Sequence, residues 1–173
     1  MLIRILCYSA LLLGIVANAA AADFSDGVRQ LNSGEYSKAL EAFKPLANAG
    51  HADAQLKLGL MYHFGLGVKE DDAVALDWFR KAADQGNADA QFFLGQMYTF
   101  GWGTHKDPDP DLQAVQWYFK AALQGHAEAQ FNLGLMFLAG KGVVQSHEEG
   151  MKWIQRAARQ GHSAAQSFVG AYQ

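Results

Sequence analysis

The stretch HADAQLKLGLMYHFGLGVKEDDAVALDWFRKAADQG, residues 51–86, decides the fold because it recurs in closely similar form. The second copy occupies residues 87–125, the third residues 126–161, and a shortened fourth copy residues 162–173. One glycine keeps the register, at intervals of 36, 39 and 36 residues: Gly59, Gly95, Gly134 and Gly170. Repetition at this period is typical of solenoids, in which each short unit packs only on its neighbours.

Each full copy predicts two helices. In the first copy, Ala54, Leu58 and Tyr62 fall at helical spacing, and the glycine pair that follows predicts the end of this helix A. Residues 73–85 again show helical spacing around Trp78, which predicts helix B. A glycine inside a helix costs about 1 kcal/mol relative to alanine, so its recurrence indicates that a neighbouring helix comes close there. We predict an all-α solenoid of stacked antiparallel helix pairs.

The repeats fill one domain, residues 23–173. Residues 23–50 form a degenerate first unit, and residues 162–173 supply a helix A alone, which we expect to cap the solenoid. The second copy is three residues longer between its helices, where Pro108 and Pro110 disfavour helix, so this loop is expected to protrude.

The first 22 residues have the layout of a secretory signal. Arg4 precedes an apolar run over residues 5–16, and small residues follow before Asp23. The run is shorter than the roughly 20 residues that a membrane-spanning helix needs. We therefore expect cleavage at the end of this segment, no integral membrane segment afterwards, and an exported protein that is periplasmic or secreted. The only cysteine, Cys7, lies within the signal, so the remaining chain must be stabilised by burial rather than by disulfides.

Two strings in residues 51–86 resemble a known family: A-x-A-Q-x-x-L-G-x-M-Y-x-x-G-x-G-V and A-x-x-W-F-x-K-A-A-x-Q-G. They are similar to the Sel-one-like repeat family, a relative of the tetratricopeptide repeats. The likeness covers residues 51–173, and residues 23–50 more loosely resemble a tetratricopeptide unit. The resemblance implies a right-handed superhelix that acts as an adaptor or scaffold, in exported bacterial members often in the cell envelope. Family members with lactam-hydrolysing activity carry a disulfide in each repeat, for which this chain has no cysteines.

Few residues suggest chemistry. His51, His126 and His162 occupy the first position of their copies, but stacked helices about 8–10 Å apart are too distant for these side chains to share one ion. We expect polar residues at the start of helix A instead. His147 and Glu148 begin a zinc-protease motif whose second histidine is missing.

Neither a calcium loop, a dinucleotide motif nor a nucleophile motif is complete. The chain has a formal net charge of −3 and no basic run, which argues against nucleic acid as a partner. We predict no catalytic residue, no metal and no cofactor. Two alternatives stay open: a cell-wall hydrolase of the lactam-hydrolysing type, and a structural subunit of an envelope complex that uses the convex face or the proline loop.

The candidate binding surface is the side of helix A that varies between copies. In tetratricopeptide-like solenoids helix A lines the concave wall, so these positions would form an apolar strip with acidic neighbours. Such a strip suits a protein or peptide partner with an apolar segment. In the alternative, the phenylalanines of the strip pack on adjacent A helices. The candidate residues are Lys57, Leu60, Phe64, Phe93, Gln96, Phe100, Asn132 and Leu135.

Overall fold

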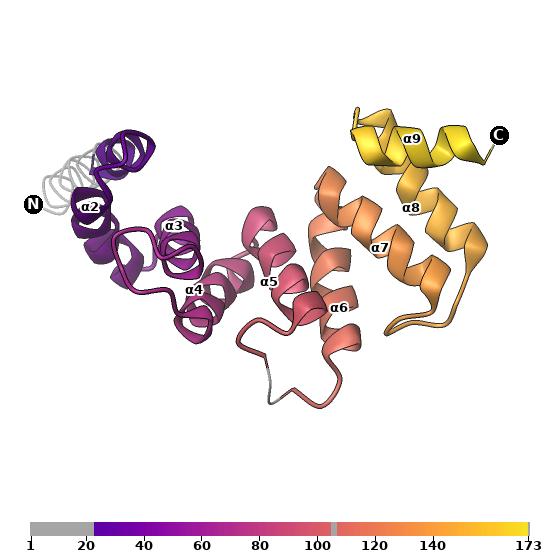
Figure 1. The fold of residues 1–173 in the computed structure, drawn as a ribbon, viewed down its shortest axis with the longest axis horizontal. Helices are drawn as coiled ribbons and strands as arrows, with labels where there is room; N and C mark the ends of the chain where they lie inside the picture. Colours follow the sequence, from indigo (N-terminus) through magenta and orange to yellow (C-terminus); the bar gives the residue numbers. More distant parts are fainter. Residues whose placement is uncertain (1–22, 105–106, 173) are drawn as a thin grey trace, which may run out of the picture.

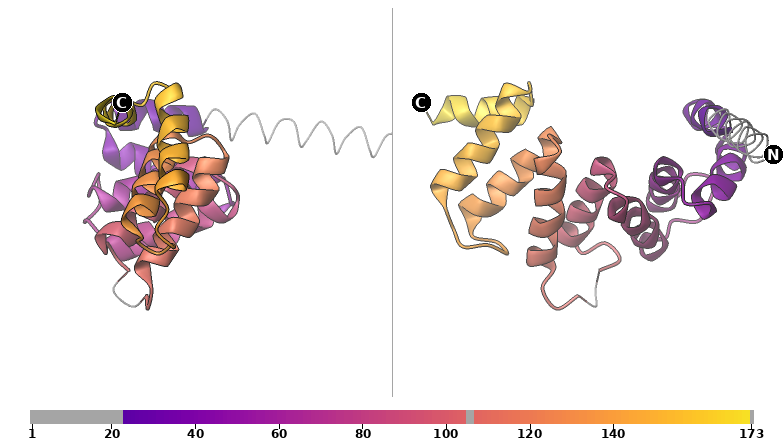
Figure 2. Two further views of the ribbon diagram at one scale, coloured as in Figure 1. Left: turned by 90° about the vertical axis from the view of Figure 1, so that its right-hand side faces the viewer. Right: turned by 180° about the vertical axis from the view of Figure 1, so that it is seen from behind.

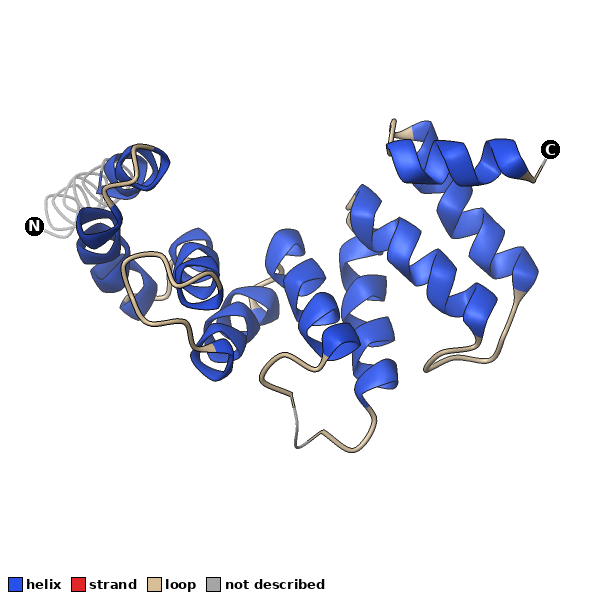
Figure 3. Cartoon of the chain, viewed as in Figure 1, coloured by secondary structure: helices blue, strands red, loops and turns tan. Residues whose placement is uncertain are grey.

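The computed structural model describes residues 23–104 and 107–172, and all regular structure in these ranges is helical (Figures 1 and 3). The predicted signal segment, residues 1–22, lies outside the described residues. A helical stretch over residues 23–32 comes first. The helices that follow are α2 (Tyr36–Asn48), α3 (Ala52–His63), α4 (Asp72–Asp84), α5 (Ala88–Phe100), α6 (Pro110–Leu123), α7 (Ala127–Ala139), α8 (His147–Arg159) and α9 (Ser163–Ala171).

The helices form a right-handed α-solenoid of antiparallel pairs. The A helices are α3, α5, α7 and α9, and the B helices are α2, α4, α6 and α8. Each A helix packs on the B helix before it, and each of α3, α5 and α7 packs also on the B helix that follows. The pairs follow an arc, and its two ends lie on the same side of the middle (Figures 1 and 2). The helices α5 and α7 also touch each other. The A helices therefore lie towards the inside of the arc.

The recurring glycine sits where helix A meets its own B helix. A Cβ atom added there would come closer than 3.0 Å to the side chain opposite, in three pairs: Gly59 with Phe79, Gly95 with Tyr118, and Gly134 with Ile154. The predicted close approach is therefore confirmed at these positions. At Gly170 an added Cβ would meet open space, because no described B helix follows α9.

The glycine pair after helix A has a second role. Gly103 has a φ of +67°, and an added Cβ would come closer than 3.0 Å to the carbonyl oxygen of Asp72. Gly142 stands in the same relation to the main chain of Asp111. The pair thus ends helix A, as the sequence predicted, and also lets the loop lie against the start of the preceding B helix. The sequence did not predict this second role.

The B helices contribute alanines and tryptophans to the core. Ala82, Ala121 and Ala157 are fully buried where the next unit stacks. A cation covers one tryptophan ring in each repeat at 3.8–4.4 Å from the centroid: Lys81 on Trp78, Lys120 on Trp117, and Arg156 on Trp153. The tryptophans therefore act in packing.

Candidate functional site

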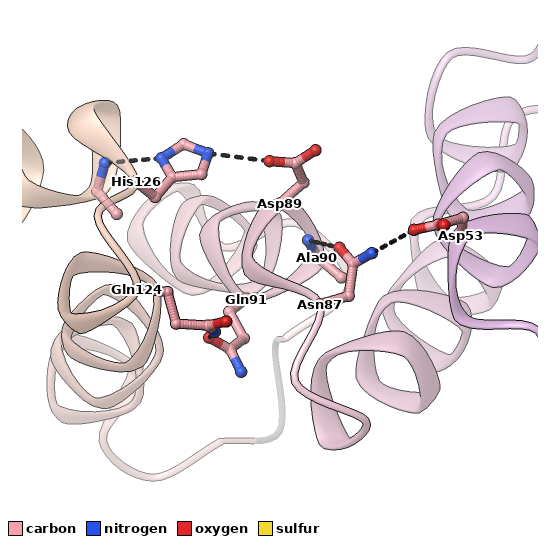
Figure 4. Close-up of polar contacts among 8 residues, drawn as sticks. Asp53, Asn87, Asp89, Ala90, Gln91, Gln124 and His126 are labelled. Carbon is pink, nitrogen blue, oxygen red and sulfur yellow. Dashed lines mark hydrogen bonds and ion pairs between the residues drawn. The ribbon is translucent and has the colours of Figure 1, made fainter.

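A buried glutamine joins each of α3, α5 and α7 to the B helices on both sides. The Nε2 of Gln91 donates to the carbonyl of Ala83 at 3.1 Å. The Oε1 of Gln91 accepts from Nε2 of Gln124 at 2.8 Å; Figure 4 shows these two side chains. Gln55 and Gln130 repeat both contacts. Each of these carbonyls, at the end of the preceding B helix, also accepts from a glycine amide, so the glutamine is its second donor. This arrangement is structural, and we call it the glutamine joint.

The first residue of each copy caps helix A, as expected for a polar residue at this place. Nδ1 of His126 accepts from the Ala129 amide at 3.2 Å, while Nε2 lies 3.4 Å from the Asp89 carboxylate (Figure 4). In the second copy Asn87 makes the same cap and donates to Asp53 at 2.8 Å. An accepting Nδ1 requires an unprotonated ring nitrogen.

Burial lowers the pKa of His126, although Asp89 and Glu128 act in the opposite direction. The ring is therefore neutral near pH 7, with its hydrogen on Nε2. In the part of the chain that the structure describes, no group of three His, Cys, Asp or Glu side chains is arranged to hold a metal ion.

The predicted strip divides into half-buried and exposed residues. Phe64 and Phe100 are each 59% exposed. Phe93 stacks on Phe79 of α4, with ring centroids 5.2 Å apart and an interplanar angle of 10°. Its ring therefore packs between the first two repeats, against a B helix. The other candidates are half-buried: Lys57, Leu60, Gln96, Asn132 and Leu135.

The two exposed phenylalanines belong to one group of rings. The ring of His63 lies 4.6 Å from Phe64 and 4.9 Å from Trp102, and Phe100 stacks on Trp102 at 4.7 Å, all between centroids. Nδ1 of His63 and Oδ1 of Asp72 are 2.6 Å apart, which fixes the central ring. We call His63, Phe64, Phe100 and Trp102 the aromatic edge.

Sequence reasoning named Phe64 and Phe100 but missed His63 and Trp102. The available signal was an aromatic residue between the paired glycines of the second copy, where the other copies have Leu66 and Lys141.

A model of the Sel1 repeat matches residues 52–87, 88–126 and 127–162. The chain belongs to the Sel1 repeat family. Proteins built of Sel1 repeats are typically non-catalytic scaffolds for protein–protein interaction. Among curated proteins, no relative matches this chain. No helix of the described residues is long and apolar enough to cross a membrane.

Solved structures agree with the Sel1 assignment. A Sel1 repeat protein from Oxalobacter formigenes is 34% identical with a TM-score of 0.79, and the match covers 86% of this chain and 60% of that one. A protective antigen of uropathogenic Escherichia coli with an SLR fold is 44% identical with a TM-score of 0.71, covering 76% and 28%. This chain thus spans less than two thirds of either protein.

Cysteine-rich protein B of Helicobacter pylori is 22% identical, with a TM-score of 0.59 and coverage of 78% of this chain and 94% of that one. This likeness concerns the fold alone.

Proposed function

We propose that this protein is an exported, non-catalytic adaptor of the bacterial cell envelope that binds a protein or peptide through its A-helix side, with the aromatic edge at the centre of the contact. The observation that carries the proposal is the exposure of Phe64 and Phe100, 59% each, although they come from different repeats and share one group of rings. Exposed aromatic clusters are common centres of binding energy because a partner can remove them from water.

The surroundings of the aromatic edge suit an apolar segment of the partner. Half-buried Leu60 and Gln96 continue the same side of α3 and α5 towards their N-terminal halves. The exposed carboxylates Asp53, Asp89 and Glu128 stand at the starts of the A helices. Charges at a rim mainly accelerate association, so a partner with basic residues beside its apolar segment fits this surface.

Export is part of the proposal and rests on the layout of residues 1–22. A charged residue, an apolar run and a small-residue site occur there in the order of a cleavable signal. N-terminal sequencing of the protein from its own host tests it, with the mature start expected within residues 20–23. Retention of Met1 would contradict export.

Binding is tested by crosslinking in intact envelopes, followed by affinity measurements with the purified partner. Phe64→Ala and Phe100→Ala should each weaken binding by about 2 kcal/mol, roughly 30-fold, with helicity unchanged. Tyr172→Ala is the matched control, because this ring is 61% exposed at the end of α9, away from the aromatic edge. Unchanged affinity in both aromatic-edge variants would overturn the proposal.

A specific observation favours a second surface. On α6 the outward residues Leu112, Phe119 and Leu123 are 38%, 42% and 63% exposed. At the same register α4 carries Ala73, Arg80 and Asp84, and α8 carries Glu148, Gln155 and Arg159. This apolar stripe on the convex side supports the alternative of a structural subunit in an envelope complex. If Leu123→Asp abolishes partner binding while the aromatic-edge variants still bind, the alternative of a structural subunit is favoured.

A further inference from the structure

A cavity of about 640 Å³ lies between the outward side of α4 and the loop that follows α5. Leu76 and Ala73 of α4 supply apolar wall, and Trp102 and Pro108 of the loop face them. This is the loop that is three residues longer than its counterparts. The volume is within the range of about 300–1,000 Å³ that ligand sites usually have.

The polar groups of the cavity are incompletely paired. The Arg80 guanidinium donates to the Tyr98 hydroxyl at 2.7 Å, and it has no other hydrogen-bond or ion-pair partner among the described residues. Thr104 is only 7% exposed, and its Oγ1 has no partner in the described part of the chain. A buried hydroxyl without a partner is costly, so a ligand that bonds it is favoured.

The hydroxyl of Tyr98 stays protonated in this setting. Burial raises the pKa of Tyr98, the charge of Arg80 lowers it, and the Asp107 carboxylate raises it again. The lining therefore holds one cation, Arg80, two neutral hydroxyls and two carboxylates, of which Asp72 is bonded to His63.

An amide group matches these partners. Its carbonyl can accept from Arg80, its N–H can donate to Asp107, and Thr104 can complete either bond. Trp102, which lines the cavity, also stacks on exposed Phe100 at 4.7 Å. The cavity is thus continuous with the aromatic edge, so a chain of amides with apolar side chains fits the surface better than a small isolated molecule.

We propose that this cavity binds an extended peptide segment of the partner, which bonds Arg80, Thr104 and Asp107 through its main-chain amides and places one apolar side chain against Leu76 and Trp102. The inference rests on the proposed function, because it assumes that the partner is a protein or peptide.

The test uses random twelve-residue peptides displayed on phage and selected on the immobilised full-length protein without its signal. Synthetic versions of the selected peptides are measured by calorimetry against the wild type, Thr104→Val and Arg80→Met. We expect each variant to weaken binding by about three- to tenfold, the effect of one hydrogen bond. Thr104→Val should not lower the melting temperature of the free protein, because it removes an unpaired buried hydroxyl and keeps the shape.

A merely structural Thr104 gives the opposite pattern: Thr104→Val then lowers the melting temperature and leaves peptide affinity unchanged. That result overturns the cavity proposal, and so does unchanged affinity in both variants. Phe64→Ala and Phe100→Ala, measured with the same peptides, separate the two proposals. If they abolish binding while Thr104→Val has no effect, the aromatic edge stands and the cavity fails. If only the cavity variants weaken binding, the aromatic edge fails.

Discussion

The second and third repeats are built with the same joints but have different outer surfaces. Gln91 and Gln130 make the same pair of hydrogen bonds to the flanking B helices. Gly95 and Gly134 both bring helix A against its B helix. These hydrogen bonds and glycine contacts tolerate little change, because all of them must recur for the next repeat to stack.

Away from the joints the two repeats diverge. The outward side of α6 carries Phe119 and Leu123, where α8 carries Gln155 and Arg159. The loop after α5 contributes Trp102 to the aromatic edge, where the loop after α7 has Lys141. The comparison teaches that recurring residues of this chain belong to stacking. Residues particular to one repeat are the candidates for function.

The largest effect on stability should come from the recurring glycine of helix A. Gly95→Leu forces a side chain into the ring of Tyr118 and should destabilise the protein by about 3 kcal/mol or more. Gly170→Leu is the matched control, since the same position in α9 faces open space, and it should be close to neutral. Urea and thermal unfolding of both variants measure the difference. Equal losses of stability would show that the recurring glycine does not act through close packing.

The second effect separates two phenylalanines that the sequence placed on one strip. Phe93→Ala loses the stacked contact with Phe79 and should cost about 2 kcal/mol of unfolding free energy. Phe100→Ala should cost less than about 0.5 kcal/mol, because this ring is 59% exposed. The same unfolding experiments test the pair. A larger loss for Phe100→Ala would mean that the aromatic edge is part of the core.

The sequence predicted the helix pairs and the close approach at the glycines, because both follow from local periodicity and repetition. The sequence could not show that Phe93 packs on Phe79, because a helical wheel with one packed side ignores that α5 lies between α4 and α6. The aromatic edge could not be predicted without the path of the loops, because the contact of His63 with Trp102 joins two repeats.

A smaller effect concerns the pH dependence of stability. Its test replaces His126 by asparagine, the residue that caps helix A in the second copy. Burial lowers the folded-state pKa of His126, so the unfolded chain binds a proton more readily than the folded one around the unfolded pKa of about 6.5. The contribution of His126 to stability is therefore complete above this pH and is lost as the pH falls from there through the lower folded-state pKa. His126→Asn, which copies Asn87, should keep the cap and flatten the pH dependence of stability.

The measurement is the unfolding free energy of wild type and His126→Asn between pH 7.5 and pH 5.5. Nearby Asp89 and Glu128 remain in both proteins, so the difference between the two curves reports His126 alone. Parallel curves would contradict a lowered pKa, and a lower curve of the variant at every pH would show that asparagine does not replace the cap.

The smallest effect on stability should come from the convex stripe of the second repeat. Leu123→Asp gives α6 the kind of residue that α4 has in Asp84, and Leu123 is 63% exposed. Surface substitutions of this kind usually change stability by less than about 0.5 kcal/mol. Urea unfolding of the wild type and Leu123→Asp measures this difference. If Leu123→Asp unfolds the protein, the stripe is part of the packing surface and not a binding surface. If the variant folds but no longer captures the partner, the stripe rather than the aromatic edge binds the partner.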